Sequence, residues 1–384
     1  MRAKYSIGVA GLLLGAFAAA DTCPPGLLAL AAEVKTLRQV PAPFAPPCRL
    51  LPAASLAAEL DRKLRRDLPL APELYLEALE RIGMIDAAGG LYPRLLTFYA
   101  SQVLGFYEPA SDEMVVVDAG NGEDPQARLL WAHELAHAAQ EHRFGLPTRL
   151  LGMGRNGDAQ RAASAVAEGE AMLVMLLLSS ARTDAELTAA QDALASQAEQ
   201  LAAPPGIPEY FVRDLLFPYT AGLEAVLRAY RAGGWRAVDE LLRNLPASTA
   251  CLLHPQQSAP GPPLADADLL PLPAGYQKVL TDTLGEWGLR HWLSRWLPTA
   301  EAGRLAAGWD SDRLLLARAT SDPASWTLAW KLRCRSPAAR AEIEAVLRRG
   351  LSPLLAGLAG QAAPVELTWA AGEHTLELRA GWPQ

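Results

Sequence analysis

The feature that most constrains this chain is a pair of histidines four residues apart, His133 and His137, with Glu134 directly after the first. Residues four apart on an α-helix lie on one face, about 6 Å apart along the axis. Two imidazoles at this spacing can bind one metal ion at the ~2.0–2.1 Å typical of zinc–nitrogen bonds. Glu134 can then act as general base on a metal-activated water. The alternative is a chance match on an amphipathic surface helix, because short motifs produce false positives.

The flanking residues predict that this motif lies in the middle of a long helix. Asp124 is a good N-cap, and Pro125 suits the first helical position. Residues 126–144 contain no glycine or proline, and Gly145 fits a C-terminal stop.

The third metal ligand is expected on a different helix. Glu141, on the motif helix itself, lies about 12 Å along the axis from the first histidine, which is too far for one ion. The apolar segment 159–180 contains Glu168 and Glu170, and carboxylates in such a segment are costly unless they are paired or bound to a metal. They lie about 200° apart on a helix, so only one can face the site. Gly169 is expected to let this helix approach the motif helix closely; the alternative places both glutamates on a solvated strip.

The order of these motifs resembles the gluzincin zinc peptidases and, more narrowly, a poorly characterised group of secreted bacterial and archaeal gluzincin-like proteins. In gluzincins the third ligand is a glutamate on a following helix, often in Glu-Gly-x-Ala, and this match selects Glu168. The resemblance implies a metallopeptidase fold with zinc held by His133, His137 and Glu168, but it implies no substrate. Weaker matching pieces follow one another over residues 100–320: Gly105-Phe106-Tyr107-Glu108-Pro109, Phe217-Pro218-Tyr219, Gly233-Gly234-Trp235, Ser248-Thr249, His254-Pro255 and Gly308-Trp309-Asp310.

Three side chains are candidates to donate a hydrogen bond to the oxyanion of a tetrahedral intermediate. Tyr219, predicted to begin a helix after Pro218, is the first choice, His254 is the second, and Tyr210 is also considered. Such a donor is worth about 2.7–4 kcal/mol in other hydrolases. Ordinary packing by an amphipathic aromatic remains open for each tyrosine.

The N-terminus predicts export. Arg2 and Lys4 precede an apolar stretch, 7–20, that ends in three alanines, as at a signal-peptide cleavage site. We expect cleavage after Ala20 and a secreted or periplasmic protein; the alternative is an uncleaved anchor. No stable transmembrane segment is expected afterwards, because the apolar segment 171–178 is too short to span a bilayer and reads as a buried helix segment.

The four cysteines suggest disulfides, because an even number in an exported chain usually pairs. None stands in Cys-x-x-Cys spacing, so a cysteine zinc site is not expected. Of three connectivities, Cys23–Cys48 with Cys251–Cys334 is preferred.

Composition predicts a globular chain with a substantial core, since 51% of residues are hydrophobic and 20% are charged. The net charge is −7 and no basic patch is visible, so nucleic acid is not an expected partner. The predicted fold is α+β and mostly helical, with a zincin-like metallopeptidase core and a C-terminal α+β region. Its expected parts are a signal peptide 1–20, a Pro/Ala-rich N-terminal arm 21–55 with a short helix at 27–39, a catalytic core 56–255, a Pro-rich linker 256–275 and the C-terminal region 276–384.

Local patterns predict several further elements. A hairpin over 104–117 is expected, whose second strand precedes the motif helix. A strand lying beside that helix is where a metallopeptidase would hold an extended substrate backbone; a plain core hairpin is the alternative. The other predicted elements are helices at 183–203, 222–232, 235–244, 277–297 and 337–355, strands at 312–320 and 327–336, and a hairpin over 365–379.

These expectations combine into a secreted zinc-dependent hydrolase, best described as a peptidase with a peptide or protein substrate. The alternative is a non-catalytic secreted or envelope binding or assembly module that retains a zincin-like fold. Four protein ligands around the metal favour the module, and an open coordination position favours the enzyme.

Overall fold

The computed structural model describes residues 26–41, 43–68, 70–117, 125–153, 156–179, 183–269, 271–355 and 367–381. The fold is α+β and mostly helical, as predicted. The predicted signal segment 1–20, with its cleavage site, lies outside the described residues. The chain divides into two compact units, each assembled from three separate segments: Met1–Pro72, Gly90–Gly154 and Ala162–Leu245 form the first, and Glu73–Gly89, Arg155–Arg161 and Pro246–Gln384 form the second.

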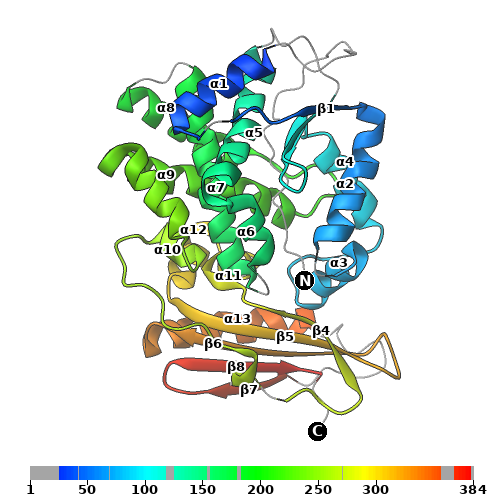
Figure 1. Ribbon diagram of the computed structural model, residues 1–384. Helices are drawn as coiled ribbons and strands as arrows, with labels where there is room; N and C mark the ends of the chain where they lie inside the picture. The colour runs from blue at the N-terminus through cyan, green and yellow to red at the C-terminus, as the bar shows by residue number, and fades with distance from the viewer. Residues whose placement is uncertain are drawn as a thin grey trace. The chain divides into compact units, whose positions relative to one another are not determined.

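The first unit consists of helices around a small sheet (Figure 1). In that sheet β3 is central, with β1 parallel on one side and β2 antiparallel on the other. Its elements are α1 (Leu27–Arg38), β1 (Cys48–Leu51), α2 (Ala53–Asp67), α4 (Leu91–Ala100), β2 (Gly105–Glu108), β3 (Glu113–Val117), α5 (Pro125–Phe144), α6 (Leu146–Gly152), α7 (Gly157–Ser179, of which the first residues belong to the second unit), α8 (Asp184–Gln200) and α9 (Glu209–Arg243).

The segment expected to be an N-terminal arm is part of the core of this unit. The helix predicted at 27–39 is confirmed as α1, which packs against α5 and buries Leu30 and Val34 in the same cluster as Leu135. Backbone hydrogen bonding joins β1 to β3. The apolar positions of α1, inside the Pro/Ala-rich segment, therefore help to cover the motif helix.

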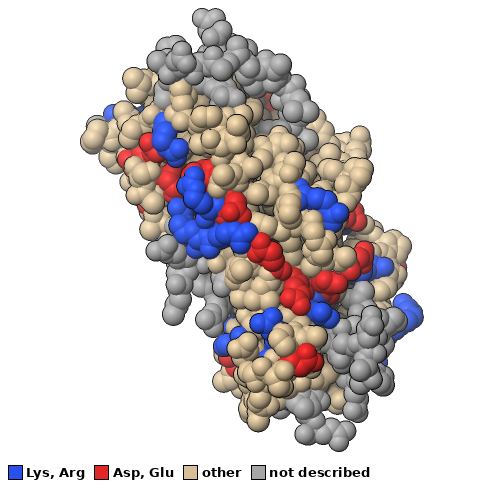
Figure 2. All heavy atoms as spheres, turned by 90° about the vertical axis from the view of Figure 1, so that its right-hand side faces the viewer, with Lys and Arg blue, Asp and Glu red and all other residues tan. Residues whose placement is uncertain are grey.

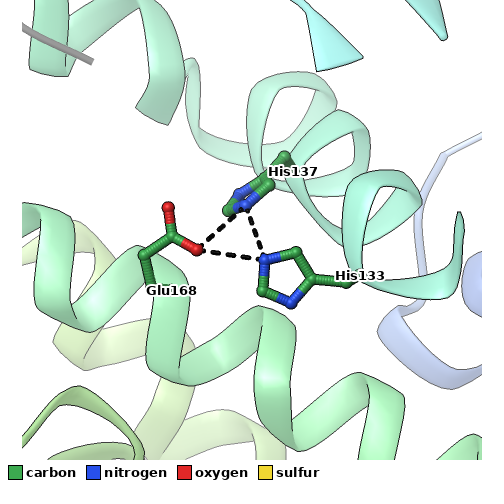
Figure 3. Close-up of side chains that lie close together, drawn as sticks. All are labelled: His133, His137 and Glu168. Atoms are coloured by element: carbon green, nitrogen blue, oxygen red, sulfur yellow. Dashed lines mark hydrogen bonds and ion pairs between the residues drawn. The ribbon is translucent and has the colours of Figure 1, made fainter. Parts of the chain in front are cut away.

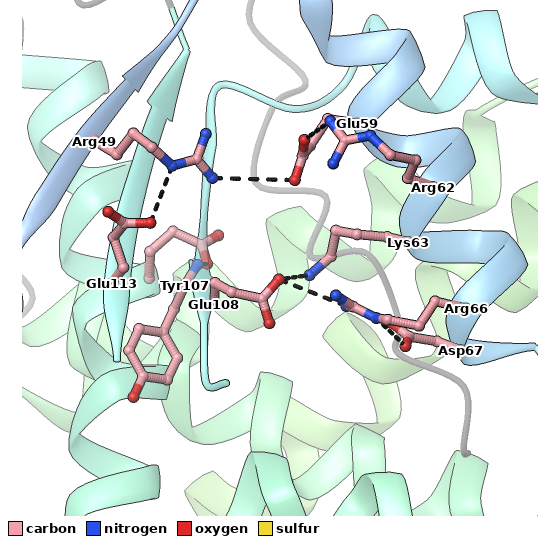
Figure 4. A network of polar contacts seen from close by, with 10 residues as sticks. Arg49, Glu59, Arg62, Lys63, Arg66, Asp67, Tyr107, Glu108 and Glu113 are labelled. Atoms are coloured by element: carbon pink, nitrogen blue, oxygen red, sulfur yellow. Dashed lines mark hydrogen bonds and ion pairs between the residues drawn. The ribbon is translucent and has the colours of Figure 1, made fainter. Parts of the chain in front are cut away.

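The predicted hairpin before the motif helix is confirmed as β2 and β3. Its charged side chains form ion pairs with neighbouring elements: Lys63 Nζ on α2 lies 2.6 Å from Glu108 Oε2, and Arg49 Nε on β1 lies 3.0 Å from Glu113 Oε2 (Figure 4). Basic and acidic side chains lie beside one another on the face shown in Figure 2. The largely buried Lys63–Glu108 pair joins α2 to the hairpin. The more exposed Arg49–Glu113 pair joins β1 to β3, and such exposed pairs contribute little individually.

Two further predictions concern helices of the first unit. The helix expected at 183–203 is α8, whose first turn has a capping box between Thr183 and Glu186. The helical pair expected around Gly233-Gly234 is α9, which has non-helical backbone at these two glycines. Because the helix already begins at Glu209, the prediction that Tyr219 starts a helix is wrong: Pro218 is tolerated inside α9.

One helix among the described residues, α7, is long and apolar enough to cross a membrane. Of its most apolar window, 67% is buried inside the protein. This burial agrees with the expectation that segment 171–178 belongs to a core helix.

The second unit contains an antiparallel sheet in the order β4-β5-β6-β8-β7. The strands predicted at 312–320 and 327–336, the C-terminal hairpin and the helix 337–355 are confirmed as β5, β6, β7–β8 and α13. The elements are α3 (Pro72–Arg81), α10 (Thr249–Leu253), the 3-10 helix η1 (Asp266–Asp268), β4 (Tyr276–Asp282), α11 (Gly285–Leu293), α12 (Thr299–Ala306), β5 (Trp309–Ala319), β6 (Trp326–Cys334), α13 (Pro337–Leu355), β7 (Leu367–Ala371) and β8 (Thr375–Ala380).

Two predictions for this unit are wrong. The helix expected over 277–297 is a strand, β4, followed by α11, because Val279 and Thr281 are β-branched and the edge of β5 needs backbone partners. The predicted Cys251–Cys334 disulfide is absent, since both cysteines are free thiols. Cys48 is disulfide-bonded, and its expected partner Cys23 lies outside the described residues, so that pairing stays a prediction.

A buried aspartate anchors α11 to the sheet. Asp312 on β5 accepts hydrogen bonds from the backbone N–H groups of Leu284 and Gly285 and from the indole N–H groups of Trp309 and Trp330. Four donors compensate the burial of one carboxylate at the start of a helix.

A second buried aspartate, Asp158, accepts hydrogen bonds from the backbone N–H and the hydroxyl of Thr249. Burial raises its pKa from 3.8 to about 7. The folded protein therefore binds this proton more tightly than the unfolded chain, and the Asp158 contribution to stability falls as pH rises from about 4 to 7.

We predict that Asp158→Asn flattens the pH dependence of the free energy of unfolding between pH 4 and 7. The slope removed is at most about 1.4 kcal/mol per pH unit. Urea unfolding at several pH values measures it, with Asp322→Asn, at an exposed position in the β5–β6 turn, as the control. An Asp158→Asn curve parallel to the wild type contradicts the prediction.

Candidate metal centre

The motif lies in α5, and the helix predicted around it is confirmed from Pro125 to Phe144. Gly145 ends the helix in the left-handed conformation, with φ of 57°. The expected N-cap, Asp124, lies outside the described residues. His133 is fully buried and Glu134 is 4% exposed, so the interpretation as a surface helix does not hold.

The two histidines and Glu168 lie together, with α5 and α7 as the supporting helices (Figure 3). His133 Nε2 lies 3.0 Å from Glu168 Oε2 and 3.3 Å from His137 Nε2. His137 Nε2 lies 3.4 Å from the same glutamate oxygen. Ligands of a tetrahedral zinc ion with bonds of ~2.0–2.1 Å are separated by about 3.3 Å, so the three atoms match one face of such a tetrahedron.

The charges of these three side chains stabilise one another. Burial raises the pKa of Glu168, but the two imidazoles outweigh burial and hold that pKa well below its usual range. Burial lowers the pKa of His137, yet the Glu168 carboxylate raises it to about 10. A metal that binds His137 must displace this proton, so metal binding is expected to release protons.

Glu134 is adjacent to the group but is held by a different partner. Its Oε2 accepts a hydrogen bond of 3.1 Å from the backbone N–H of Tyr107 on β2. Burial raises the pKa of this carboxyl group, against the opposing effect of the two histidines. The edge strand of the small sheet thus orients the carboxylate that the motif assigns as general base.

Glu170, two residues after Glu168, lies away from the metal ligands. It is fully buried and pairs with Arg38 from α1 and Gln140 from α5. The prediction that only one of the two glutamates faces the site is confirmed, and the solvated-strip alternative is wrong.

The close approach expected at Gly169 involves a different neighbour from the one predicted. A Cβ at Gly169 would overlap the backbone of Gly222, and a Cβ at Gly222 would overlap the carbonyl of Ala165. Gly169 therefore lets α7 touch α9, not the motif helix. This contact brings Tyr219 toward the site from α9.

The predicted hydrogen-bond donors lie in different parts of the chain. The Tyr219 ring centroid lies 6.0 Å from that of His133, and this tyrosine is buried. Tyr210, also buried on α9, packs edge-on against Phe211. His254 belongs to the second unit, where its Nε2 lies 2.6 Å from Glu286 Oε1. The donor role of each stays a prediction.

Sequence reasoning missed the residues that contact the candidate metal ligands from behind. Gln140 Oε1 lies 3.0 Å from His137 Nδ1, and Gln140 also contacts Glu170. Arg38 joins Glu170 to Asp239 on α9. Gln140 was detectable in principle, because it follows His137 by three residues on one helix. Arg38 and Asp239 carry no such local signal.

No model of a protein family, no curated protein and no solved structure matches this chain. The function must therefore be inferred from the site alone.

We predict that the purified protein binds one zinc ion through His133, His137 and Glu168. The variants His133→Ala and Glu168→Ala should lose it, because two ligands on one helix hold zinc weakly without the third. Elemental analysis after dialysis measures the zinc content, with Glu141→Ala on the same helix as the control. Full zinc retention in Glu168→Ala would remove Glu168 from the ligand set.

Proposed function

We propose that the chain is a zinc-dependent peptidase of the gluzincin type, with His133, His137 and Glu168 as ligands and Glu134 as general base. The observation that carries this proposal is the spacing of three side-chain atoms, two histidine Nε2 atoms and one glutamate Oε2. Their separations are close to those between the ligands of a tetrahedral zinc ion. The same residues are those selected by the motif order in the sequence.

Zinc in such a site lowers the pKa of a water in its open coordination position and polarises a carbonyl group. Glu134 would supply the general base, a carboxylate oxygen that accepts a proton from the attacking water. Because burial raises its pKa and Tyr107 orients it, Glu134 is suited to accept a proton.

A peptide is the substrate class that the surrounding backbone supports best. Among the strands that the structure describes, β2 has one neighbour, β3, and on its other edge the Tyr107 N–H donates to Glu134 on α5. An extended peptide can add to such an edge through main-chain hydrogen bonds. A strand in this position places a bound peptide bond beside the general base.

The number of ligands favours an enzyme over a binding or assembly module with structural zinc. Among the described residues, the group able to hold a metal has three members, where a structural zinc site normally has four. Export of the protein remains part of the proposal and depends on the sequence of residues 1–20 alone.

We predict that Glu134→Gln abolishes peptide hydrolysis while zinc content and folding stay near wild type. The change keeps the shape of the side chain and removes its basicity, so the rate should fall about 10²–10⁴-fold. Unfolded casein and a quenched fluorescent peptide library at neutral pH supply substrates, with Glu141→Gln as the control. An active wild type matched by Glu134→Gln rejects this mechanism, and a zinc-loaded wild type that cleaves nothing favours the binding module.

We predict that Tyr219→Phe lowers kcat about 10²–10³-fold, the usual effect of removing one oxyanion donor. Tyr230→Phe, on the same helix but not among the candidate donors, is the control and should change kcat little. Zinc content should be unchanged in both variants. Equal kcat for Tyr219→Phe and wild type would leave Tyr219 with a packing role.

A further inference from the structure

The orientation of the Gln140 side-chain amide is set by two acceptors on one side. Its Nε2 donates to the carbonyl of Ala167 at 2.8 Å and to Glu170 Oε2 at 2.5 Å. Only the NH₂ end of an amide can donate, so Oε1 must be the atom that faces His137. At 3.0 Å from an acceptor oxygen, His137 Nδ1 must carry a proton and donate.

This hydrogen bond has a direct consequence for the metal site. A neutral imidazole protonated on Nδ1 has its lone pair on Nε2, which is the atom that lies beside Glu168 and His133. Such hydrogen bonds to the second ring nitrogen orient metal-binding histidines in general. By contrast, His133 Nδ1 is buried without a hydrogen-bond partner among the described residues.

Glu170, which accepts a hydrogen bond from Gln140, has a fully buried carboxylate. Burying a carboxylate is costly unless it is hydrogen-bonded or paired with a cation. Arg38, the last residue of α1, supplies it through an Nε–H donated to Oε1. The same guanidinium donates to Asp239 Oδ1 at 2.8 Å and stacks over Trp235, 3.9 Å from the ring centroid.

We infer that Gln140, Glu170 and Arg38 are positioning residues that hold His137 with its Nε2 lone pair toward the metal, so that helix α1 controls zinc affinity. This inference rests on the proposed metal centre. It assigns α1, which contributes no metal ligand, a role in the chemistry of the site. The chain of contacts runs from α1 through α7 to α5.

An ion pair that joins α1 directly to α5 provides a matched control. Arg128 Nη2 lies 2.6 Å from Glu33 Oε1, and both side chains are partly exposed. This pair joins the same two helices without contacting Gln140 or Glu170. Glu33→Gln therefore weakens a contact of α1 that is not connected to His137. It tests whether loss of any contact of α1 lowers zinc affinity, or only loss of the contacts through Glu170 and Gln140.

The experiment measures zinc affinity by competition with a chelator, the visible spectrum of the cobalt(II) form, and urea unfolding of the metal-free protein. Gln140→Met has similar length and no hydrogen-bonding amide, so it should bind zinc about 10–100-fold more weakly and shift the cobalt spectrum. Arg38→Met should also weaken binding, because Glu170 is then left without its cation. Glu33→Gln should stay within about threefold of wild type, as for other exposed pairs.

The double variant Arg38→Met/Glu170→Gln separates positioning from folding. An amide at position 170 needs no cation and still offers an oxygen to the Gln140 NH₂ group, so zinc affinity should return to near the wild-type value. If Arg38→Met alone does not fold, the double variant still tests whether Arg38 affects zinc affinity through Glu170. A loss in the double variant as large as in Gln140→Met overturns the role of α1.

Three other outcomes separate this inference from the proposed function. Wild-type affinity and spectrum in Gln140→Met overturn the inference and leave the peptidase proposal intact. If Gln140→Met binds zinc more weakly and the zinc-loaded wild type cleaves no peptide, the inference is supported and the peptidase proposal is rejected. A wild type that binds no zinc overturns both.

Discussion

The first unit is organised around one electrostatic constraint: carboxylates that lie away from water must each be matched by a partner. Glu168 is 4% exposed and Glu170 is fully buried, and both belong to one turn of α7. Glu168 is matched by two imidazoles or, in the proposed function, by a cation bound with them. Glu170 is matched by Arg38 and Gln140. Helix α5 supplies partners to both glutamates, and α1 supplies the cation of Glu170, so both helices lie against α7.

Helices that share such short polar contacts must approach closely, and the sequence accommodates this with small residues. The buried faces of α5 and α7 are rich in alanine, including Ala136, Ala139, Ala163 and Ala167. Larger side chains there would separate the helix axes, and the short reach of histidine and glutamate would not close a gap of several ångströms. The contact of Gly169 with α9 meets the same requirement on another face of α7.

The parts of the structure that sequence could predict are those encoded locally. The motif helix, the preceding hairpin, the strands β5 and β6 and the helix α13 follow from periodicity and end signals, and Glu168 follows from motif order. The contacts of Arg38 with Glu170 and Asp239 join residues 132 and 201 positions apart, so no local pattern reveals them. The same limit explains why Gly169 was assigned the correct purpose but the wrong neighbour. It also explains the failed Cys251–Cys334 pairing, since cysteine counting carries no information on distance.

Glu134 is the residue that separates a catalytic from a structural interpretation of the metal centre. A structural zinc site is satisfied by its ligands and gains nothing from an additional buried carboxylate beside them. Here that carboxylate is 4% exposed, its pKa is raised by burial, and its Oε2 accepts a hydrogen bond from a neutral backbone N–H. Ionisable groups whose pKa is shifted by burial are enriched at sites where they transfer protons. The position of Glu134 between the candidate metal ligands and β2 is therefore consistent with the proposed role as general base.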